Sequence, residues 1–433
     1  MDGSYLIFSS AIVVALAYGA AHLPLAQRWQ PPQPPLLLLL VFALAIRWLF
    51  LLLYPEPGTG DLRFDAESYR LVADTVRQGK DVYATTLRHP YLPFHMYWFA
   101  FAVDLEDWFG STFFSWVRWP NILADLGILA IIYRGSLKLG RSASMAFWLG
   151  FLWAVQPVSI FHSVLHGQFH AVAIFFALLA WYLLRFWPGW RGVLLGGLAL
   201  GFGVLDHSWP IIFVPVFLLL VPGLKSKAVF LSTVAAVPLL FFLIYDLSIG
   251  TSFDIFRVAV IEHEPTPGRF GISWALDRYP GSVLPDGWIG FATDYHREVL
   301  LGTLAIVAAT VIPRRDTLVA ATAIIAAIYA ATFSMGSQQM LWIIPFALMA
   351  GQVRMLALYS AALIPGLFIH YWGTCGFVCP GLLSDETQYW SLQLIWPVAI
   401  FWMLREVALS IPWRETFAAF MAGLRGERQV RPA

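Results

Sequence analysis

Residues 35–54 read PLLLLLVFALAIRWLFLLLY, a run in which Arg47 is the only charged side chain. A membrane-spanning α-helix needs about 20 mainly apolar residues, so this stretch alone predicts a helix that crosses a bilayer. Of all 433 residues, 59% are hydrophobic and 12% are charged, whereas soluble domains have roughly 45–50% apolar and about 25% charged residues. The composition excludes an ordinary soluble enzyme and predicts an all-α, polytopic integral membrane protein.

About thirteen apolar stretches of this kind lie between polar or turn-forming breaks. The expected spans cover residues 4–23, 35–54, 112–133, 143–163, 169–186, 192–205, 209–222, 228–247, 298–313, 317–335, 339–352, 355–371 and 388–404. The start of the chain lacks the positive charge of a signal peptide, so the first span is expected to stay attached. No repeat or soluble domain divides the chain, and residues 1–433 are expected to form one transmembrane domain.

The distribution of charge orients these spans, because short cytoplasmic loops carry an excess of Lys and Arg. One orientation places most basic clusters inside and most acidic residues outside, provided that the apolar segment 91–103 lies in the membrane interface instead of crossing. The clusters assigned to the cytoplasm include Arg134, Arg185, Lys225, Arg314 and Arg405. Two long outer segments result, 55–111 with interfacial helices and 248–297, together with an amphipathic cytoplasmic tail, 406–433.

The first outer segment holds the best candidate for a catalytic acid or base. Asp65 lies near the start of a predicted helix, and Glu67 follows two residues later. One interpretation is that Asp65 only caps a surface helix, whose first amides favour a carboxylate. The other is that Asp65 takes a proton from a substrate hydroxyl just above the bilayer, with Glu67 assisting. Asp61, in the same segment, is an expected substrate-binding residue.

Basic residues gather in the second outer segment, where Arg257, His263 and Arg269 are the preferred candidates for binding a phosphate. Arginine gives charge-assisted hydrogen bonds to phosphate oxygens, and neutralising a leaving phosphate is what a glycosyl transfer needs. A solvated loop with local ion pairs is the alternative. The inner side has no phosphate-cradling glycine loop, so a nucleotide-driven reaction is disfavoured, and lipids or lipid-linked substrates are expected.

Short polar turns between apolar spans supply further candidates. His166, Gln168 and His170 lie at the turn after the expected span 143–163. His207 lies between the expected spans 192–205 and 209–222, and Gln338 lies between 317–335 and 339–352. Hydrogen bonding to substrate is preferred over metal binding here, because no carboxylate or cysteine accompanies the histidines locally. Arg47 either snorkels to the surface or faces a polar cavity. The two cysteines, Cys375 and Cys379, share an outer turn where a short-loop disulfide is possible.

Four stretches carry a resemblance to a known enzyme class. They read FDAESY at 64–69 with GKDVY at 79–83 and HPYLP at 89–93, RWPNILAD at 118–125, SVLHGQFH at 163–170 and SQQMLWIIP at 337–345. In order and sidedness they resemble motifs of the GT-C glycosyltransferases, multi-pass enzymes that take a sugar from a polyprenyl phosphate. The first is similar to the acidic motif of the glycosylphosphatidylinositol mannosyltransferases and their bacterial relatives.

The resemblance implies a GT-C-like fold in which Asp65 is the catalytic base, Glu67 assists, and the second outer segment holds the donor phosphate. It implies inverting transfer of a sugar, with mannose as the first choice, from a polyprenyl-phosphate donor to a lipid-linked or glycan acceptor. Glu67 and His170 replace acids usual in the family, which leaves the sugar and any need for a divalent metal open. No bound cofactor is expected.

Membrane lipid is an expected partner and nucleic acid is not, since the formal net charge is only +1. The compact loops favour a bacterial plasma membrane over the endoplasmic reticulum. Two other functions stay open at this point. A multi-pass lipid or sugar transporter or flippase would also use many helices and polar groups at membrane depth. A noncatalytic subunit of a glycosylation complex is the second alternative.

Overall fold

The computed structural model describes residues 35–58, 61–261, 271, 294–333, 335–374 and 393–412. Within these ranges the chain forms helices joined by turns and has no strand, which confirms the all-α prediction for this part. The helices are α3 (Pro35–Leu53), α4 (Asp61–Arg77), α5 (Val82–Thr85), α6 (His95–Phe109), α7 (Phe113–Val117), α8 (Trp119–Lys138), α9 (Ala143–Ala154), α10 (Pro157–Ile160), η1 (Phe161–His166), α11 (His170–Phe186), α12 (Trp190–Asp206), η2 (Trp209–Phe213), α13 (Val214–Phe217), α14 (Gly223–Ile249), α15 (Phe253–Phe256), η3 (Arg257–Ile261), α18 (His296–Val311), α19 (Thr317–Ala331), η4 (Ser337–Leu341), α20 (Ile343–Ala350), α21 (Val353–Thr374) and α23 (Ile395–Ser410).

Helices α3 and α14 are long and apolar enough to cross a membrane, and a bent pair formed by α9 with residues 157–166 can count as a third span. Other apolar helices in the described ranges, such as α11 and α19, are shorter. The expected span at 143–163 is thus divided by a 40° bend. Thirteen crossings stay a prediction, and the expected first span, the cysteine pair and nearly all of the cytoplasmic tail lie outside the described residues.

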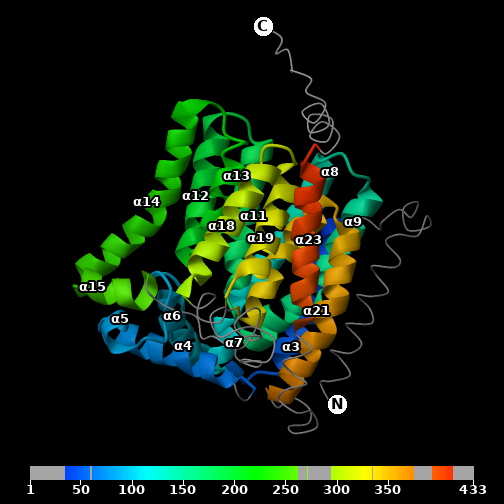
Figure 1. Ribbon diagram of the computed structural model, residues 1–433. Helices are drawn as coiled ribbons and strands as arrows, with labels where there is room; N and C mark the ends of the chain where they lie inside the picture. Colours follow the sequence, from blue (N-terminus) through cyan, green and yellow to red (C-terminus); the bar gives the residue numbers. More distant parts are fainter. Residues whose placement is uncertain are drawn as a thin grey trace, which may run out of the picture.

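Two helices of the first long polar segment, α4 and α6, form a layer at one end of the bundle (Figure 1). Their facing sides bury Tyr69 and Val72 of α4 against Phe99 and Val103 of α6. Ion pairs between Arg70 and Glu106, and between Arg77 and acidic residues of α6, line the outer edge of this contact. Two helices that share one apolar face and one charged face fit the interfacial layer expected for residues 55–111.

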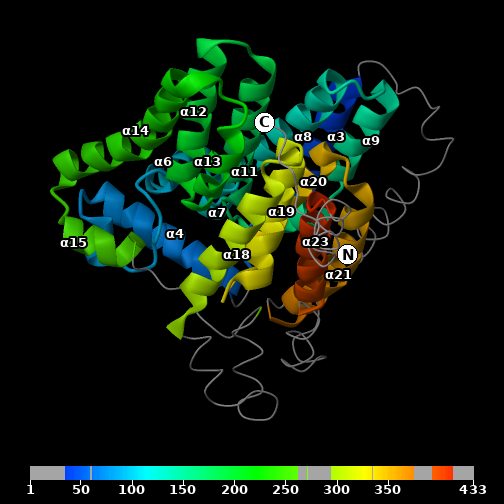
Figure 2. The same cartoon turned by 45° about the horizontal axis from the view of Figure 1, so that its top comes forward.

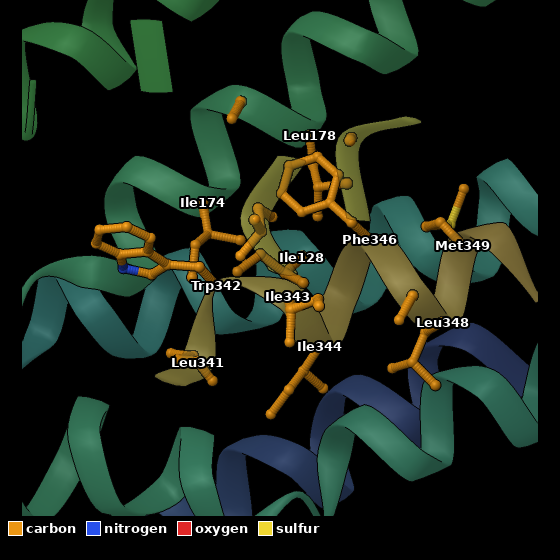
Figure 3. Packing of buried hydrophobic residues seen from close by; sticks show 14 of the residues in the cluster. Ile128, Ile174, Leu178, Leu341, Trp342, Ile343, Ile344, Phe346, Leu348 and Met349 are labelled. Atoms are coloured by element: carbon orange, nitrogen blue, oxygen red, sulfur yellow. The ribbon is translucent and has the colours of Figure 1, made fainter. Parts of the chain in front are cut away.

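The centre of the bundle is built around α20, which is apolar on all sides. Its residues from Ile343 to Met349 are all buried, as expected of a helix without a polar face. Figure 3 shows Trp342 and Phe346 beside Ile174 and Leu178 of α11. This packing fixes Trp342, which precedes α20, against the start of α11.

A buried ion pair ties the first described helix to the bundle. Leu39, Ala43 and Arg47 lie at helical spacing on the buried face of α3. Arg47 is fully buried and donates through Nε to Asp125 Oδ2 of α8 at 3.0 Å, and through Nη2 to Ser159 at 2.8 Å. Arg47 therefore neither snorkels nor faces open water, because its partner is a buried carboxylate.

We expect loss of one partner to be more harmful than loss of both, because a lone buried charge has no compensation. Arg47→Leu or Asp125→Leu should each lower the free energy of unfolding by about 3–5 kcal/mol. The double variant should recover much of that loss. Chemical denaturation of the purified protein in detergent measures this, with Arg63→Leu, from an exposed pair, as the control expected to change little. Additive losses in the double variant would contradict the role of the pair.

Helices α12 and α14 approach each other closely at two glycines. A Cβ on Gly197 would stand 2.9 Å from the Cβ of Thr233, and one on Gly201 would stand 2.9 Å from the Cβ of Val237. Real Cβ atoms do not come so close, so only glycine permits this crossing. Small residues four apart are a common way for helices in membranes to pack backbone against backbone.

Candidate functional site

Asp65 lies on the face of α4 that also carries the buried Tyr69 and Val72, at the edge of the layer. Its Oδ2 accepts a hydrogen bond from Nε2 of His166 at 2.8 Å and another from the amide of Gln168. The Asp65 side chain is 27% exposed, whereas that of His166 is only 4% exposed. Three residues that the sequence predicted separately therefore meet in one cluster, from segments about a hundred residues apart.

The turn that presents His166 and Gln168 has an uncommon backbone. A single turn of π-helix, η1, ends at Gly167, which has a φ of 75°. A side chain at this left-handed position would be strained, and its Cβ would stand 3.2 Å from the ring of Phe114. Single π-turns inside helical segments occur frequently at functional sites. Here the turn lets residues on both sides of the glycine reach the same carboxylate.

The donors on Asp65 leave one of its oxygens available. An ionised carboxylate only accepts hydrogen bonds, so His166 must carry a proton on Nε2 and Gln168 must donate through its NH₂ group. Both bonds end on Oδ2, and no described residue donates to Oδ1. The Asp65 side chain is partly exposed, and we expect an incoming hydroxyl to approach it at Oδ1.

A second carboxylate, Asp206, lies at the end of α12 and is completely buried. It accepts a hydrogen bond from Nε2 of His95 on one oxygen and from Nδ1 of His207 on the other, the latter at 2.9 Å. The His207 ring lies 4.4 Å from the His170 ring, centre to centre. Trp342 donates from its indole nitrogen to His170 Nδ1 at 3.1 Å. Two imidazoles, His95 and His207, thus bind one buried acid, and a third, His170, lies next to His207.

The sequence predicted His170 and His207 as site residues but missed Asp206, His95 and Trp342 as parts of the same group. Asp206 was visible as a polar interruption between apolar spans, and His95 as the one histidine in the apolar segment 91–103. A polar residue in such a segment needs a buried partner, which is the signal that would have singled them out.

Tyr91 lies between the two acidic groups. Its ring is 4.7 Å from that of His207. Burial, followed by the negative charges of Asp65 and Asp206, raises the pKa of Tyr91. The phenol is therefore neutral at physiological pH and can donate or accept a hydrogen bond.

Two cavities flank the α4–α6 layer. The first has a volume of about 630 Å³ and an almost entirely apolar lining. Its walls are Phe94, His95, Tyr97, Trp98, Phe101, Pro120, Leu123, Ala124, Val172, Phe175, Phe176 and Phe241. The second, of about 480 Å³, is more polar and includes Arg63, Glu67, Arg70 and Glu106 in its walls. The apolar cavity suits a hydrocarbon chain, and the more polar cavity suits a polar molecule.

The remaining predicted site residues lie elsewhere. Glu67 points to another face of α4 and pairs with Arg63 at 2.9 Å, in a pair exposed to solvent. Arg257 is half-exposed beside Asp254 at the start of η3. Gln338 lies in η4, folded back toward Gly336.

Asp61 begins α4, but its side chain, like His263 and Arg269, lies outside the residues that the structure describes in full. Among the described side chains, no three His, Cys, Asp or Glu residues are placed to bind one metal ion.

Comparisons with protein families, with curated proteins and with solved structures find no match for this chain. The resemblance to GT-C glycosyltransferases therefore rests on the sequence motifs alone. The geometry around the carboxylates of Asp65 and Asp206 is then the main evidence on function.

We expect the buried His89 to make the fold sensitive to acid. Burial, followed by the charges of His95 and His207, lowers the pKa of His89 to about 3, against 6.5 for a free side chain. Between these values the unfolded chain binds the extra proton, so stability is lost as the pH falls from 6.5 toward 3. The slope contributed by one such group is at most about 1.4 kcal/mol per pH unit.

His89→Gln should remove most of this slope, because glutamine does not titrate. Unfolding midpoints of the detergent-solubilised protein at pH 7, 6, 5 and 4 measure the effect. His296→Gln, far along the sequence and only partly buried, serves as the matched control and should keep the slope. An unchanged slope in His89→Gln would show that another group is responsible.

Proposed function

We propose that this protein is a multi-pass membrane glycosyltransferase of a bacterial plasma membrane. It moves a sugar, with mannose as the first choice, from a polyprenyl-phosphate donor to a hydroxyl of a lipid-linked or glycan acceptor at the extracytoplasmic face. The observation that carries the proposal is the arrangement at Asp65. One of its oxygens is held by His166 and Gln168, and the other is free to accept a proton at the edge of the membrane-facing layer.

The proposed reaction is a single displacement. The acceptor oxygen attacks the anomeric carbon while the bond from that carbon to the phosphate oxygen breaks, and the phosphate leaves with the electron pair. The hydroxyl proton passes to Asp65 Oδ1, and the configuration at the anomeric carbon inverts. One carboxylate is enough for this chemistry, because no covalent intermediate on the enzyme is formed.

His166 and Gln168 act as positioning residues in this proposal. Two donors on Oδ2 fix the rotation of the carboxylate, so that Oδ1 keeps one direction relative to the acceptor. Both donors belong to a completely buried turn, which makes their own positions well defined. A base held in this way needs little reorganisation during the reaction.

The two cavities that flank α4 and α6 support substrates of the proposed kind. The 630 Å³ cavity is apolar and adjoins α6, as a hydrocarbon tail requires, and the 480 Å³ cavity beside α4 carries both charge signs, as a polyhydroxylated acceptor requires. The charged outer face of α4 and α6 is compatible with a position at the membrane surface.

Replacement of the base is the direct test. Asp65→Asn keeps the size of the side chain but removes the proton acceptor, so transfer should fall by about 10²–10⁴-fold. Purified protein is incubated with radiolabelled polyprenyl-phosphate mannose and a lipid acceptor extract, and labelled product is counted. Asp104→Asn is the matched control and should retain most activity, since Asp104 is a partly exposed acid of α6 that pairs with Arg77 and lines neither cavity.

Full transfer by Asp65→Asn would remove Asp65 from the mechanism. No transfer by the purified wild-type protein, with transfer restored by a second membrane protein, would favour a noncatalytic subunit. Movement of labelled lipid across the bilayer without transfer would favour a flippase.

A further inference from the structure

We propose that His207, oriented by Asp206, binds the phosphate group of the lipid donor together with His170, and that the lipid tail occupies the apolar cavity bounded by His95. The donor class rests on the function proposed above. The location of its phosphate is a separate claim, because it depends on the histidine group alone.

One ring nitrogen of His207 has a hydrogen-bond partner, and the other has none among the described residues. Nδ1 donates to Asp206, whereas Nε2 is buried and has no hydrogen-bond partner among the described residues. The side chain is only 7% exposed, so bulk water does not compensate for the missing partner. Buried polar atoms are nearly always paired, and an exception at a site of this kind indicates a missing ligand.

His170 supplies a second donor. The indole nitrogen of Trp342 can only donate, so Nδ1 of His170 must accept and the neutral ring must carry its proton on Nε2. Trp342 is itself fixed by stacking on Trp209, with ring centres 4.1 Å apart and planes within 7°. The tautomer of His170 is thereby set by packing, and its donor lies on a ring next to that of His207.

A phosphate group matches these two rings. Phosphate oxygens accept hydrogen bonds, and His207 donates through Nε2 when its ring carries both protons. The positive ring then lies between two anions, the buried Asp206 and the phosphate, and attracts both. In the described part of the second outer segment, Arg257 is half-exposed and lies beside Asp254, so it is less suited to hold a phosphate in a buried position.

His95 connects the histidine group to the place of the tail. Its ring lines the apolar cavity, and its Nε2 donates to Asp206. A lipid whose chain lies along Phe94, Trp98 and Phe176 therefore has its polar end near the imidazoles that Asp206 orients. A lipid with a terminal phosphate fits this site better than a phosphodiester lipid with two bulky chains. The reason is that the phosphate must reach a buried ring.

The test measures binding and needs no turnover. Purified full-length protein in nanodiscs of phosphatidylcholine is titrated with farnesyl phosphate, farnesol or inorganic phosphate. Farnesyl phosphate should bind more tightly than either of the other probes. His207→Gln should weaken farnesyl phosphate by about 10-fold or more and leave farnesol unchanged. Ala124→Phe, which fills the cavity, should weaken both prenyl probes. His296→Gln is the matched control.

Since the buried His207 can also matter for folding, a second measurement uses the wild-type chain. A photoreactive farnesyl phosphate should cross-link to α6, α8, α11 or α14, which line the cavity. Cross-links confined to other helices would overturn the proposal, as would wild-type affinity in both His207→Gln and Ala124→Phe. Complete displacement of the probe by phosphatidylglycerol would show that the cavity takes phospholipid instead, which also overturns it.

Asp65→Asn separates this inference from the proposed function. The variant should bind farnesyl phosphate like the wild type while losing transfer. If it still transfers sugar, Asp65 is not the base, and the phosphate site is unaffected. If the wild type binds farnesyl phosphate but transfers no sugar, the proposed function fails although the phosphate site stands. If His207→Gln binds normally while Asp65→Asn loses transfer, the phosphate site fails and the proposed function survives.

Discussion

The bond between Arg47 and Asp125 is the constraint on which the rest of the structure depends. A charge inside an apolar bundle is stable only with a partner, so α3 and α8 have one relative position. Arg47 also donates to the backbone oxygen of Ala154 and to Ser159, on either side of the bend between α9 and α10. The π-turn that carries His166 follows directly, and its place is therefore set by a charge on another helix.

The two buried clusters illustrate how surroundings assign different roles to the same chemical group. Asp65 is partly exposed and keeps one oxygen without a described partner, so it is suited to accept a proton. Asp206 is fully buried and has both oxygens bonded to imidazoles, so it is suited to orient its neighbours. Tyr91 lies close enough to both acids for their negative charges to raise its pKa. Pairs of carboxylates in contrasting environments are a common basis for division of labour in enzymes.

The sequence was sufficient to predict the helical class and to name Asp65, His166 and Gln168 as separate site candidates, but it did not predict that they meet. Composition decides the first, and polar residues at the same end of successive apolar runs indicate the second. The sequence did not predict that Asp125 is the partner of Arg47. Asp125 lies 78 positions away, and only the packing of α3 against α8 brings the two side chains together.

Helical geometry alone would have separated Glu67 from Asp65, since residues two apart lie on different faces. The expected span at 143–163 is broken by a bend at Pro157 and by the π-turn. Hydropathy did not reveal this, because the residues on both sides of the bend are apolar.

Helix α14 is held against α12 at the close crossing of Gly197 and Gly201. Tyr245, near the far end of the same helix, hydrogen-bonds to Asp81 and to the backbone of Val82, at the start of α5. Figure 2 shows that this end of α14 leads toward α15 beside the layer of α4 and α6. Tyr245 lies eight positions past Val237, about 12 Å along the axis. α14 is held at this crossing and tied to α5 at its far end, with Pro238 between the two points, so a slight tilt of the helix at the glycines would displace the surface layer that holds the reacting carboxylate.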